Sequence, residues 1–346
     1  MKKIILIYSI ASFFFTFDSF SQVKNSKENF IKDVPTGITI KGDDFYVDGK
    51  KIQLAGNHTW NTVQHINGER ISMNKITGNF TRLWTIETKG AVFAGSTWGS
   101  NSPGVVKIRN VPWKNDKSGL LNPRYYVALE RTVRAANKKG IIVSVCLFEG
   151  SIVPYFGASG DSWKLHPFNG IKNGPTESWQ VHSKGPWNEY QRAHVKEVTS
   201  RLEKYDNVMY EVGNELHRES TKWFQGKVIE WVKSFTDKPV GASYATGMKE
   251  SKNRTQDWLT TIDADWIAPA GAQKLPRFKG PQILDTDHAW PLHSKVNGLR
   301  DAWNAGRSIL LMDGFHGTML RNQDNLQPDR NFIDSVIVNR KQKVDR

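Results

Sequence analysis

The order of apolar segments along the chain constrains its fold more than any other feature. Short runs rich in β-branched and aromatic residues alternate with longer segments whose apolar residues recur at helical spacing. Such alternation is typical of βαβ units, in which the strands of one sheet run parallel. No change of composition interrupts it, so we expect a single domain.

Eight runs fit strands when they are counted from residue 52. The predicted strands are 52–55, 79–88, 141–148, the run from Val208 to Asn214-Glu215, 239–245, 265–270, 281–286 and 308–313. The predicted helices are 122–138, 187–205, 221–235, 255–262 and 297–304. Eight such units favour a closed (β/α)8 barrel over an open doubly wound sheet, because no GxGxxG turn supports the open sheet.

The 346 residues exceed the ~250 that such a barrel needs, which leaves room for long loops. Residues 150–186, rich in Gly, Pro, Ser and Trp, form one of them. Loops of that length are uncommon unless they shape a site or are disordered.

The N-terminus has the pattern of an export signal. Lys2 and Lys3 precede an apolar run at residues 4–17, and Ser19-Phe20-Ser21 offers small residues at the cleavage positions. We expect a signal peptide at residues 1–21 and a secreted or periplasmic protein.

The chain beyond this signal divides into two predicted parts. Residues 22–36 are polar and are expected to be a flexible lead-in. Residues 37–346 are expected to form the α/β barrel, which opens with a β-hairpin signalled by Gly42-Asp43 and Asp48-Gly49.

Charge and cysteine content limit the function further. The formal net charge is +14, but the basic residues are dispersed and no nucleic-acid-binding motif is present. An anionic polysaccharide substrate and a solvated surface without functional meaning both fit this charge. The single cysteine, Cys146, lies in an apolar run and is expected to be an unreactive core residue.

Polar residues stand where the predicted strands end, which is the face that carries the chemistry of α/β barrels. Two carboxyl groups facing each other across a sugar are the arrangement that glycoside hydrolysis requires. The polar and aromatic residues at these ends are Asn57, His58, Arg82, Trp84, Glu149, Asn214, Glu215, Tyr244, Asp285, Asp287, His288, Asp313 and His316.

Three segments, "FYVDGKKIQLAGNHTW", "NFTRLW" and above all "YEVGNE", resemble the clan A glycoside hydrolases, the cellulase-like eightfold barrels. The resemblance implies that Glu215 is the general acid/base and that Asn214 binds the sugar 2-hydroxyl. It also implies that Arg82 is a partner of the nucleophile. The strand count independently places Asn214-Glu215 at the end of the fourth strand.

The seventh strand departs from the clan, whose nucleophile there is a Glu. This chain has "PQILDTDHAW" instead, with Asp285 and Asp287 on one face by the two-residue strand period. This run, with the later "LLMDGF", resembles a group of secreted bacterial barrels associated with polysaccharide breakdown. We expect Asp285 to be the nucleophile, with Asp287 as the alternative. Because Asp is one methylene shorter than Glu, both retention and inversion stay open, and retention is preferred.

Further residues are expected to bind substrate, and several have a structural alternative. Arg82 could instead pair with a buried carboxylate inside the barrel, and Glu149 could cap a loop rather than serve as a third acid. Trp84, Trp290 and Trp187 could stack on sugars or fill the core. The predicted substrate-binding residues are Asn214, Arg82, His58, Trp84, Tyr244, His288, Trp290 and His316.

Two other functions compete with hydrolysis by two carboxylates. Asp285, Asp287, His288 and His58 could ligate a metal, although HxH and HExxH spacings are missing. A carbohydrate-binding barrel without activity is the second alternative. We expect a monomer with a carbohydrate substrate, no cofactor or metal, no nucleic-acid partner and no membrane span.

Overall fold

A computed structural model describes the parts of the chain on which the following account rests. These are residues 37–58, 78–88, 92–93, 106–107, 110–150, 161–214, 216, 221–244, 261–269, 278–285 and 295–311. Only the backbone is described for residues 58, 92–93, 106–107, 161–162, 243–244, 269, 285, 295–299 and 311. All of them belong to one compact unit, Val34–Arg346.

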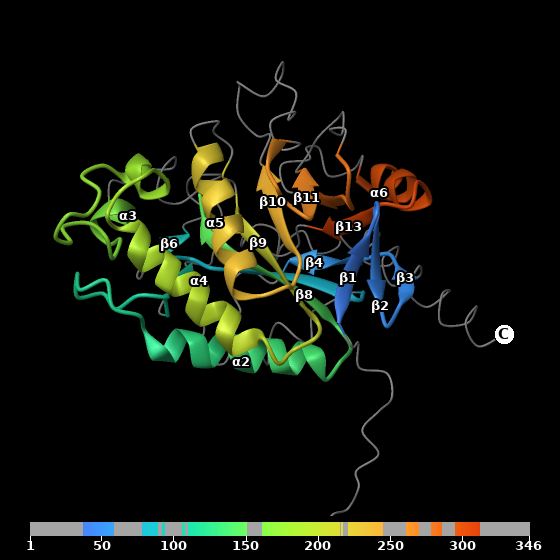
Figure 1. The fold of residues 1–346 in the computed structure, drawn as a ribbon, viewed down its shortest axis with the longest axis horizontal. Coiled ribbons are helices and arrows are strands. Elements are labelled where there is room, and N and C mark those ends of the chain that lie inside the picture. Colours follow the sequence, from blue (N-terminus) through green and yellow to red (C-terminus); the bar gives the residue numbers. More distant parts are fainter. Residues whose placement is uncertain are drawn as a thin grey trace, which may run out of the picture. The chain divides into compact units, whose positions relative to one another are not determined.

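Eight parallel strands form the central sheet, in the order β11-β10-β9-β8-β5-β4-β13-β12 (Figure 1). The two outer strands meet through a parallel bridge between Ile267 and Gln282, where the Ile267 amide donates to the Pro281 carbonyl at 3.1 Å. The sheet therefore closes, and the predicted (β/α)8 barrel is confirmed. The strands are β4 (Ala55–His58), β5 (Phe80–Trp84), β8 (Ile142–Glu149), β9 (Val208–Asn214), β10 (Val240–Tyr244), β11 (Trp266–Pro269), β12 (Ile283–Asp285) and β13 (Ser308–Leu311).

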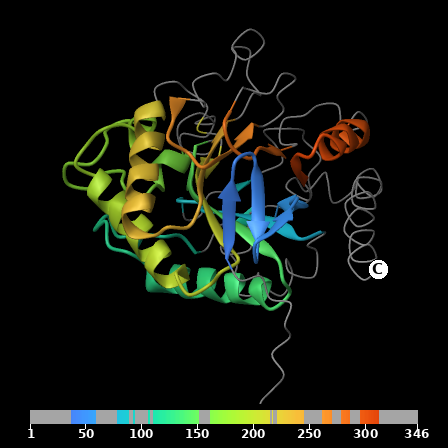
Figure 2. The ribbon, with the colours of Figure 1, turned by 45° about the vertical axis from the view of Figure 1, so that its right-hand side comes forward.

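Helices pack on the outside of the barrel close to their predicted positions. Figures 1 and 2 show α2, α4 and α5 together along one flank, while α6 lies beside β13. Asn122 caps α2 by accepting the Arg124 amide at 3.2 Å, and Pro123 occupies the first helical position, where its missing N–H costs nothing. Most of the predicted helix 255–262 lies outside the described residues. The helices are α2 (Pro123–Asn137), α4 (Asn188–Leu202), α5 (Lys222–Phe235) and α6 (Lys295–Asn304).

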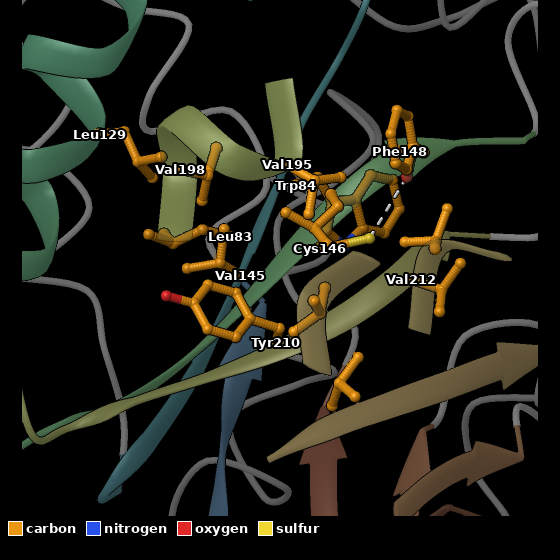
Figure 3. Packing of buried hydrophobic residues seen from close by; sticks show 14 of the residues in the cluster. Leu83, Trp84, Leu129, Val145, Cys146, Phe148, Val195, Val198, Tyr210 and Val212 are labelled. Atoms are coloured by element: carbon orange, nitrogen blue, oxygen red, sulfur yellow. Dashed lines mark hydrogen bonds between the residues drawn. The ribbon is translucent and has the colours of Figure 1, made fainter. Parts of the chain in front are cut away.

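The larger core cluster lies between the strands and these helices. In Figure 3, Leu83, Val145 and Tyr210 of the strands face Leu129 of α2 and Val198 of α4. Cys146 is fully buried beside this layer, and its Sγ donates to the Phe148 carbonyl at 3.4 Å. The expectation that Cys146 is a core residue is confirmed.

A second cluster fills the barrel interior at the end where the strands begin. It includes Phe80, Ile142 and Met209 from neighbouring strands, joined by Ile38 and Phe45 from the N-terminal sheet. Because side chains alternate along a strand, residues two positions further along β5 and β9 face the same interior, nearer the carboxyl ends of the strands.

The N-terminal sheet covers the end of the barrel where the strands begin. It has three antiparallel strands, β1 (Ile38–Lys41), β2 (Asp44–Val47) and β3 (Lys50–Ile52). Asp48 and Gly49, with φ of 53° and 72°, make the tight turn between β2 and β3 that their sequence predicted. The predicted hairpin is thus present with a third strand. The predicted strand 52–55 is wrong as one unit, because it divides between β3 and β4.

Short elements occupy the long connections at the other end. The described part of the loop after β8 contains a helical turn, α3 (Asp161–Lys164), and a 3-10 helix, η2 (Ser178–His182). A small antiparallel pair, β6 (Val92–Phe93) and β7 (Val106–Lys107), follows β5. The described part of the loop is therefore ordered, which agrees with a loop that shapes a site.

Close strand packing makes one glycine of the barrel irreplaceable. A Cβ atom on Gly56 in β4 would lie 1.7 Å from the carbonyl oxygen of Phe80 in β5, a backbone atom that cannot move aside. We predict that Gly56→Ala lowers the free energy of unfolding by about 3 kcal/mol or more. Gly226→Ala in α5, where the added Cβ meets nothing within 4 Å, should raise it by ~0.5–1 kcal/mol. Urea unfolding measures both, and equal effects would contradict the prediction.

Candidate active site

The polar side chains of the site project from three neighbouring strands, β5, β8 and β9, above the interior cluster. Arg82 follows Phe80 by two residues, and Glu211 follows Met209 by two, so both face the barrel interior. The registers bring them close, since Arg82 pairs with Ser144 in β8 and Glu211 pairs with Cys146. Local strand geometry therefore places a cation and an anion in the same interior layer.

Arg82 and Glu211 form a bidentate ion pair that is almost fully removed from solvent. The Arg82 Nε donates to Glu211 Oε2 at 2.6 Å, and a terminal guanidinium nitrogen donates to Oε1 at 2.5 Å. The two side chains are 1% and 0% exposed. Buried charges are tolerated only when they are paired and hydrogen-bonded. This is the buried pair that the sequence left open as an alternative role for Arg82.

The Asn214 amide lies between this cation and a second carboxylate. Its Oδ1 accepts a hydrogen bond from Arg82 at 2.8 Å. Its Nδ2 donates toward both carboxylate oxygens of Glu149, at 3.3 and 3.2 Å. Asn214 is 2% exposed and Glu149 is 1% exposed, so neither contact is a surface contact. The last residues of β8 and β9 are thus joined side chain to side chain.

Leu216, on the other side of residue 215, is also held. Its carbonyl accepts from Thr221 Oγ1 at 3.0 Å and from Gln225 Nε2 at 2.8 Å, both near the start of α5. Its side chain is fully buried and reaches Gly213, where an added Cβ would lie 2.5 Å from Leu216 Cδ1. Glu215 itself lies outside the described residues, but both of its chain neighbours are anchored.

The surroundings of the ion pair include a hydroxyl, a thiol and an indole. Ser144 Oγ donates to Glu211 Oε2 at 3.4 Å, and the Arg82 guanidinium lies 3.6 Å from Cys146 Sγ. Burial raises the pKa of the Cys146 thiol well above its ordinary value, with Glu211 and Glu149 adding to the effect and Arg82 opposing it. The thiol is therefore protonated and unreactive at neutral pH. The guanidinium also lies 5.3 Å from the Trp84 ring centroid.

A second buried cluster ties the loop after β8 to the barrel. The His166 Nε2 lies 3.0 Å from Glu87 Oε2, just beyond β5, and the His166 Nδ1 accepts the Phe168 amide at 3.1 Å. Because Nδ1 is an acceptor, the proton of the neutral ring sits on Nε2, which donates to Glu87. Glu87 Oε1 in turn accepts the Glu149 amide at 3.4 Å. The loop, the end of β5 and the end of β8 therefore share one carboxylate.

The charge state of this cluster follows from its contacts. Burial by itself would raise the pKa of Glu87, but the hydrogen bond from His166 and the nearby His182 outweigh it and lower this pKa to about 2. Burial lowers the pKa of His166, against the opposing effect of Glu87. His182 Nε2 is 3.8 Å from Glu87 Oε1, and neither ring nitrogen of His182 has a hydrogen-bond partner within the described part of the chain.

Several predicted site residues cannot be placed. Glu215, Asp287, His288, Trp290 and His316 lie outside the described residues, and the side chains of His58, Tyr244 and Asp285 lie outside them too. Their roles stay predictions. Their backbone positions, where described, are at the carboxyl ends of β4, β10 and β12.

The described predicted residues come together only in part. Arg82, Asn214 and Trp84 meet in one buried group, and Glu149 joins it through Asn214 rather than only capping a loop. Trp84 is 1% exposed, which fits its alternative as a core residue, and its role in sugar stacking stays a prediction. Trp187 is 8% exposed and donates its Nε1–H to the Val181 carbonyl at 3.1 Å, which also favours a core role.

Glu211, Glu87, His166 and His182 were missed. Glu211 had a signal, since a charged residue two positions after Met209 in an otherwise apolar strand must face the barrel interior and needs a partner there. Glu87 follows β5 at the expected active face, but nothing local connects it to histidines of a loop some eighty residues later.

No group of three or more His, Cys, Asp or Glu side chains in the described regions has an arrangement that could hold a metal ion. None of the helices described is long and apolar enough to cross a membrane.

Comparison with known proteins supports the fold. No protein-family model and no curated protein sequence matches this chain. Among solved structures, the endo-1,4-β-mannanase from Rhizomucor miehei superposes with a TM-score of 0.51 at 11% identity, over 80% of this chain and 90% of the mannanase. At that identity the similarity concerns the fold alone, and it agrees with the barrel described above.

Two further structures are similar at lower TM-scores. A glycoside hydrolase family 5 protein from Bacteroides vulgatus gives a TM-score of 0.43 at 9% identity, over 82% of this chain and 54% of that protein. Endo-glycoceramidase II from Rhodococcus sp., in a ganglioside GM3 complex, gives 0.46 at 13% identity, over 80% and 77%. These values are too low to support more than the general similarity.

Removing one partner of the buried ion pair should cost more than removing both. Glu211→Gln leaves the Arg82 guanidinium buried without its counter-charge, so we predict a loss of about 3–5 kcal/mol in the free energy of unfolding. The double variant Arg82→Met, Glu211→Gln should be more stable than the single variant Arg82→Met or Glu211→Gln, because no unpaired charge remains. Chemical denaturation of the four proteins tests this. Losses that simply add in the double variant would contradict it.

The Glu87 cluster should make stability depend on acidity in a defined range. The folded carboxyl has a pKa of about 2 against an ordinary value of 4.5, so the unfolded chain takes up a proton first as the pH falls. The stabilisation is complete above pH 4.5 and is lost as the pH falls toward 2, by roughly 3 kcal/mol in total.

The matched variant is Glu87→Gln. Between pH 5.5 and 3, the stability of the wild-type protein should fall toward that of the variant by up to ~1.4 kcal/mol per pH unit below the unfolded-state pKa. Two stability curves that stay parallel across this range would contradict the lowered pKa, because they require Glu87 to have the same pKa in the folded and unfolded chain.

Proposed function

We propose that this protein is a glycoside hydrolase that cleaves the O-glycosidic bonds of a polysaccharide or oligosaccharide with two carboxylates. Glu215 is the general acid/base, and a carboxylate at the end of β12 is the second catalytic group. The proposal joins the barrel fold, the resemblance of "YEVGNE" to clan A enzymes and the buried polar network beside residue 215.

The observation that carries the proposal is that both chain neighbours of residue 215 are anchored. Asn214 is held by Arg82 and Glu149, and Leu216 is held by Thr221 and Gln225. A residue that only ends a strand at the surface needs no such buried network, whereas a catalytic group must be held within a fraction of an ångström. The position is also the carboxyl end of the fourth barrel strand, on the active face of this fold.

Asp285 is proposed as the second carboxylate. Its strand, β12, is separated from β9 by β10 and β11 along the sheet, so the two strand ends lie on different walls of the barrel. Asp285 is the last residue of β12 and pairs with Leu310 of β13, which fixes its backbone. Asp287 is the alternative two residues further on. A retaining reaction is proposed, with covalent attack by the aspartate at the anomeric carbon and proton donation by Glu215.

Replacing the general acid/base tests the assignment directly. Glu215→Gln should lower turnover by at least roughly a hundredfold, the usual scale of general acid/base catalysis, while glycan binding persists. Reducing-end detection on a panel of purified glycans measures turnover, and calorimetry measures binding. Glu230→Gln, which removes a carboxylate that pairs with Lys227 on α5, is the control and should retain activity.

The outcomes separate the alternatives. Near-normal turnover of Glu215→Gln would dismiss its role. Binding without turnover by the wild-type protein would identify a carbohydrate-binding barrel. Loss of activity on exhaustive chelation would indicate a metal-dependent hydrolase instead.

The second carboxylate and the stereochemistry can be tested together. Proton NMR in the first minutes of hydrolysis should show the product anomer with the configuration of the substrate. Azide should restore turnover to Asp285→Ala, because a small nucleophile can replace a missing carboxylate nucleophile. Rescue confined to Asp287→Ala would move the role to that residue, and initial release of the opposite anomer would refute retention.

The substrate is proposed to be anionic, such as a sulfated or uronic-acid polysaccharide, because the net charge is +14. The attraction should weaken with salt, since exposed charges are screened beyond ~8 Å at physiological ionic strength. A Michaelis constant that does not change with salt would contradict this part of the proposal.

Export is proposed from the N-terminal sequence, with the mature chain beginning at Gln22 and acting outside the cytoplasm as a monomer. N-terminal sequencing of the protein from its native host tests this, and an intact Met1 would exclude it. Sedimentation of the mature protein tests the monomer.

A further inference from the structure

We infer that Glu149 is a positioning residue of the active site, which sets the direction of the Asn214 amide and places a negative charge against the residue that precedes Glu215. This inference rests on the proposed function, because it assigns Glu149 to the same site. Sequence reasoning favoured a loop-capping role for Glu149, and the contacts of its carboxylate point to a different one.

The Asn214 amide lies between the Arg82 guanidinium and the Glu149 carboxylate. Asn214 Oδ1 accepts from Arg82 at 2.8 Å, while Nδ2 lies 3.3 and 3.2 Å from the two Glu149 oxygens. If the amide turned over, its NH2 group would face the guanidinium and its oxygen would face the carboxylate. Both contacts would then be repulsive in a site with almost no solvent, so only one orientation is stable.

Glu149 is itself held so that it can impose this orientation. Its backbone amide donates to Glu87 Oε1 at 3.4 Å, and the following amide, Gly150, donates to the Asn214 carbonyl at 2.7 Å. Glu149 also pairs in register with Asn214 across β8 and β9. Two hydrogen bonds thus fix the backbone from which the Glu149 carboxylate reaches the Asn214 amide on the neighbouring strand.

The consequence for chemistry concerns both geometry and charge. A fixed amide presents its remaining donor capacity to a substrate hydroxyl in one direction only. A carboxylate bonded to the residue before Glu215 also disfavours ionisation of Glu215 by like-charge repulsion, which helps to keep the acid protonated. The positive charge of Arg82 is balanced by Glu211, because both Glu211 carboxylate oxygens accept from the guanidinium.

Two variants separate these contributions. Glu149→Gln removes the charge with little change of shape, while Glu149→Asp keeps the charge and withdraws the carboxylate from Asn214. Glu203→Gln is the matched control. Glu203 follows α4 and accepts a hydrogen bond from Thr236 Oγ1, which follows α5, away from the network. The titration of Glu215 is followed by carbon-13 NMR in the free protein, with the signal assigned from Glu215→Gln, and the pH dependence of kcat/KM is measured in parallel.

In Glu149→Gln, the pKa of Glu215 and the alkaline limb of the pH–rate profile should both move to lower pH by roughly half to one unit. In Glu149→Asp, both should stay within about 0.3 units of wild type, while kcat/KM falls at least roughly tenfold because the amide loses its acceptor. Glu203→Gln should match wild type in the pKa of Glu215, in the alkaline limb of the pH–rate profile and in kcat/KM.

The outcomes also distinguish this inference from the proposed function. An unchanged Glu215 titration in a folded Glu149→Gln protein would overturn the inference, even if the wild-type protein hydrolyses glycans. A shifted titration in a protein that hydrolyses no glycan would support the placement of Glu149 and reject the proposed function. If Glu149→Gln does not fold, wild-type kcat/KM in Glu149→Asp would overturn the inference, and a tenfold loss would support it.

Discussion

The ion pair between Arg82 and Glu211 is the interaction on which the barrel depends at the carboxyl ends of its strands. Two strands that are not neighbours, β5 and β9, each place a charged residue in an interior that excludes water, with β8 between them. Neither charge is tolerable alone, so the pair requires that the three strands keep their registers. Because Arg82 also donates to Asn214, the same requirement extends to the strand end that carries Glu215. Stability and the placement of the proposed catalytic acid are therefore linked.

The barrel is divided into an apolar end and a polar end. At the apolar end, the interior cluster and the N-terminal sheet exclude water and supply burial energy without any specific chemistry. At the polar end, the buried side chains of Arg82, Glu211, Asn214 and Glu149 are hydrogen-bonded to one another. Such a network costs more to assemble than an apolar layer of the same size. The proposed active site at this end accounts for the presence of a polar layer.

The described part of the loop after β8 is attached to this end through the Glu87 carboxylate, which follows β5. The Glu87 carboxylate accepts hydrogen bonds from His166 of the loop and from the backbone amide of Glu149 in β8. The loop is therefore attached to the residue that orients Asn214. Because the pKa of Glu87 is lowered to about 2, this carboxylate is ionised throughout the neutral and mildly acidic range. The attachment is thus a fixed support at neutral pH.

The sequence by itself determined the order of strands and helices, the tight turns at Asp48-Gly49, and the placement of Asn214-Glu215 at the end of the fourth barrel strand. These features depend on local periodicity and turn chemistry, which a few neighbouring residues decide. Only the tertiary structure decided that Arg82 pairs with Glu211, 129 positions later, and that Glu149 receives the Asn214 amide. Several carboxylates were available to each of these groups. Which one it meets depends on strand register and on the packing of distant segments, and the residues next to Arg82 or Asn214 do not specify the partner.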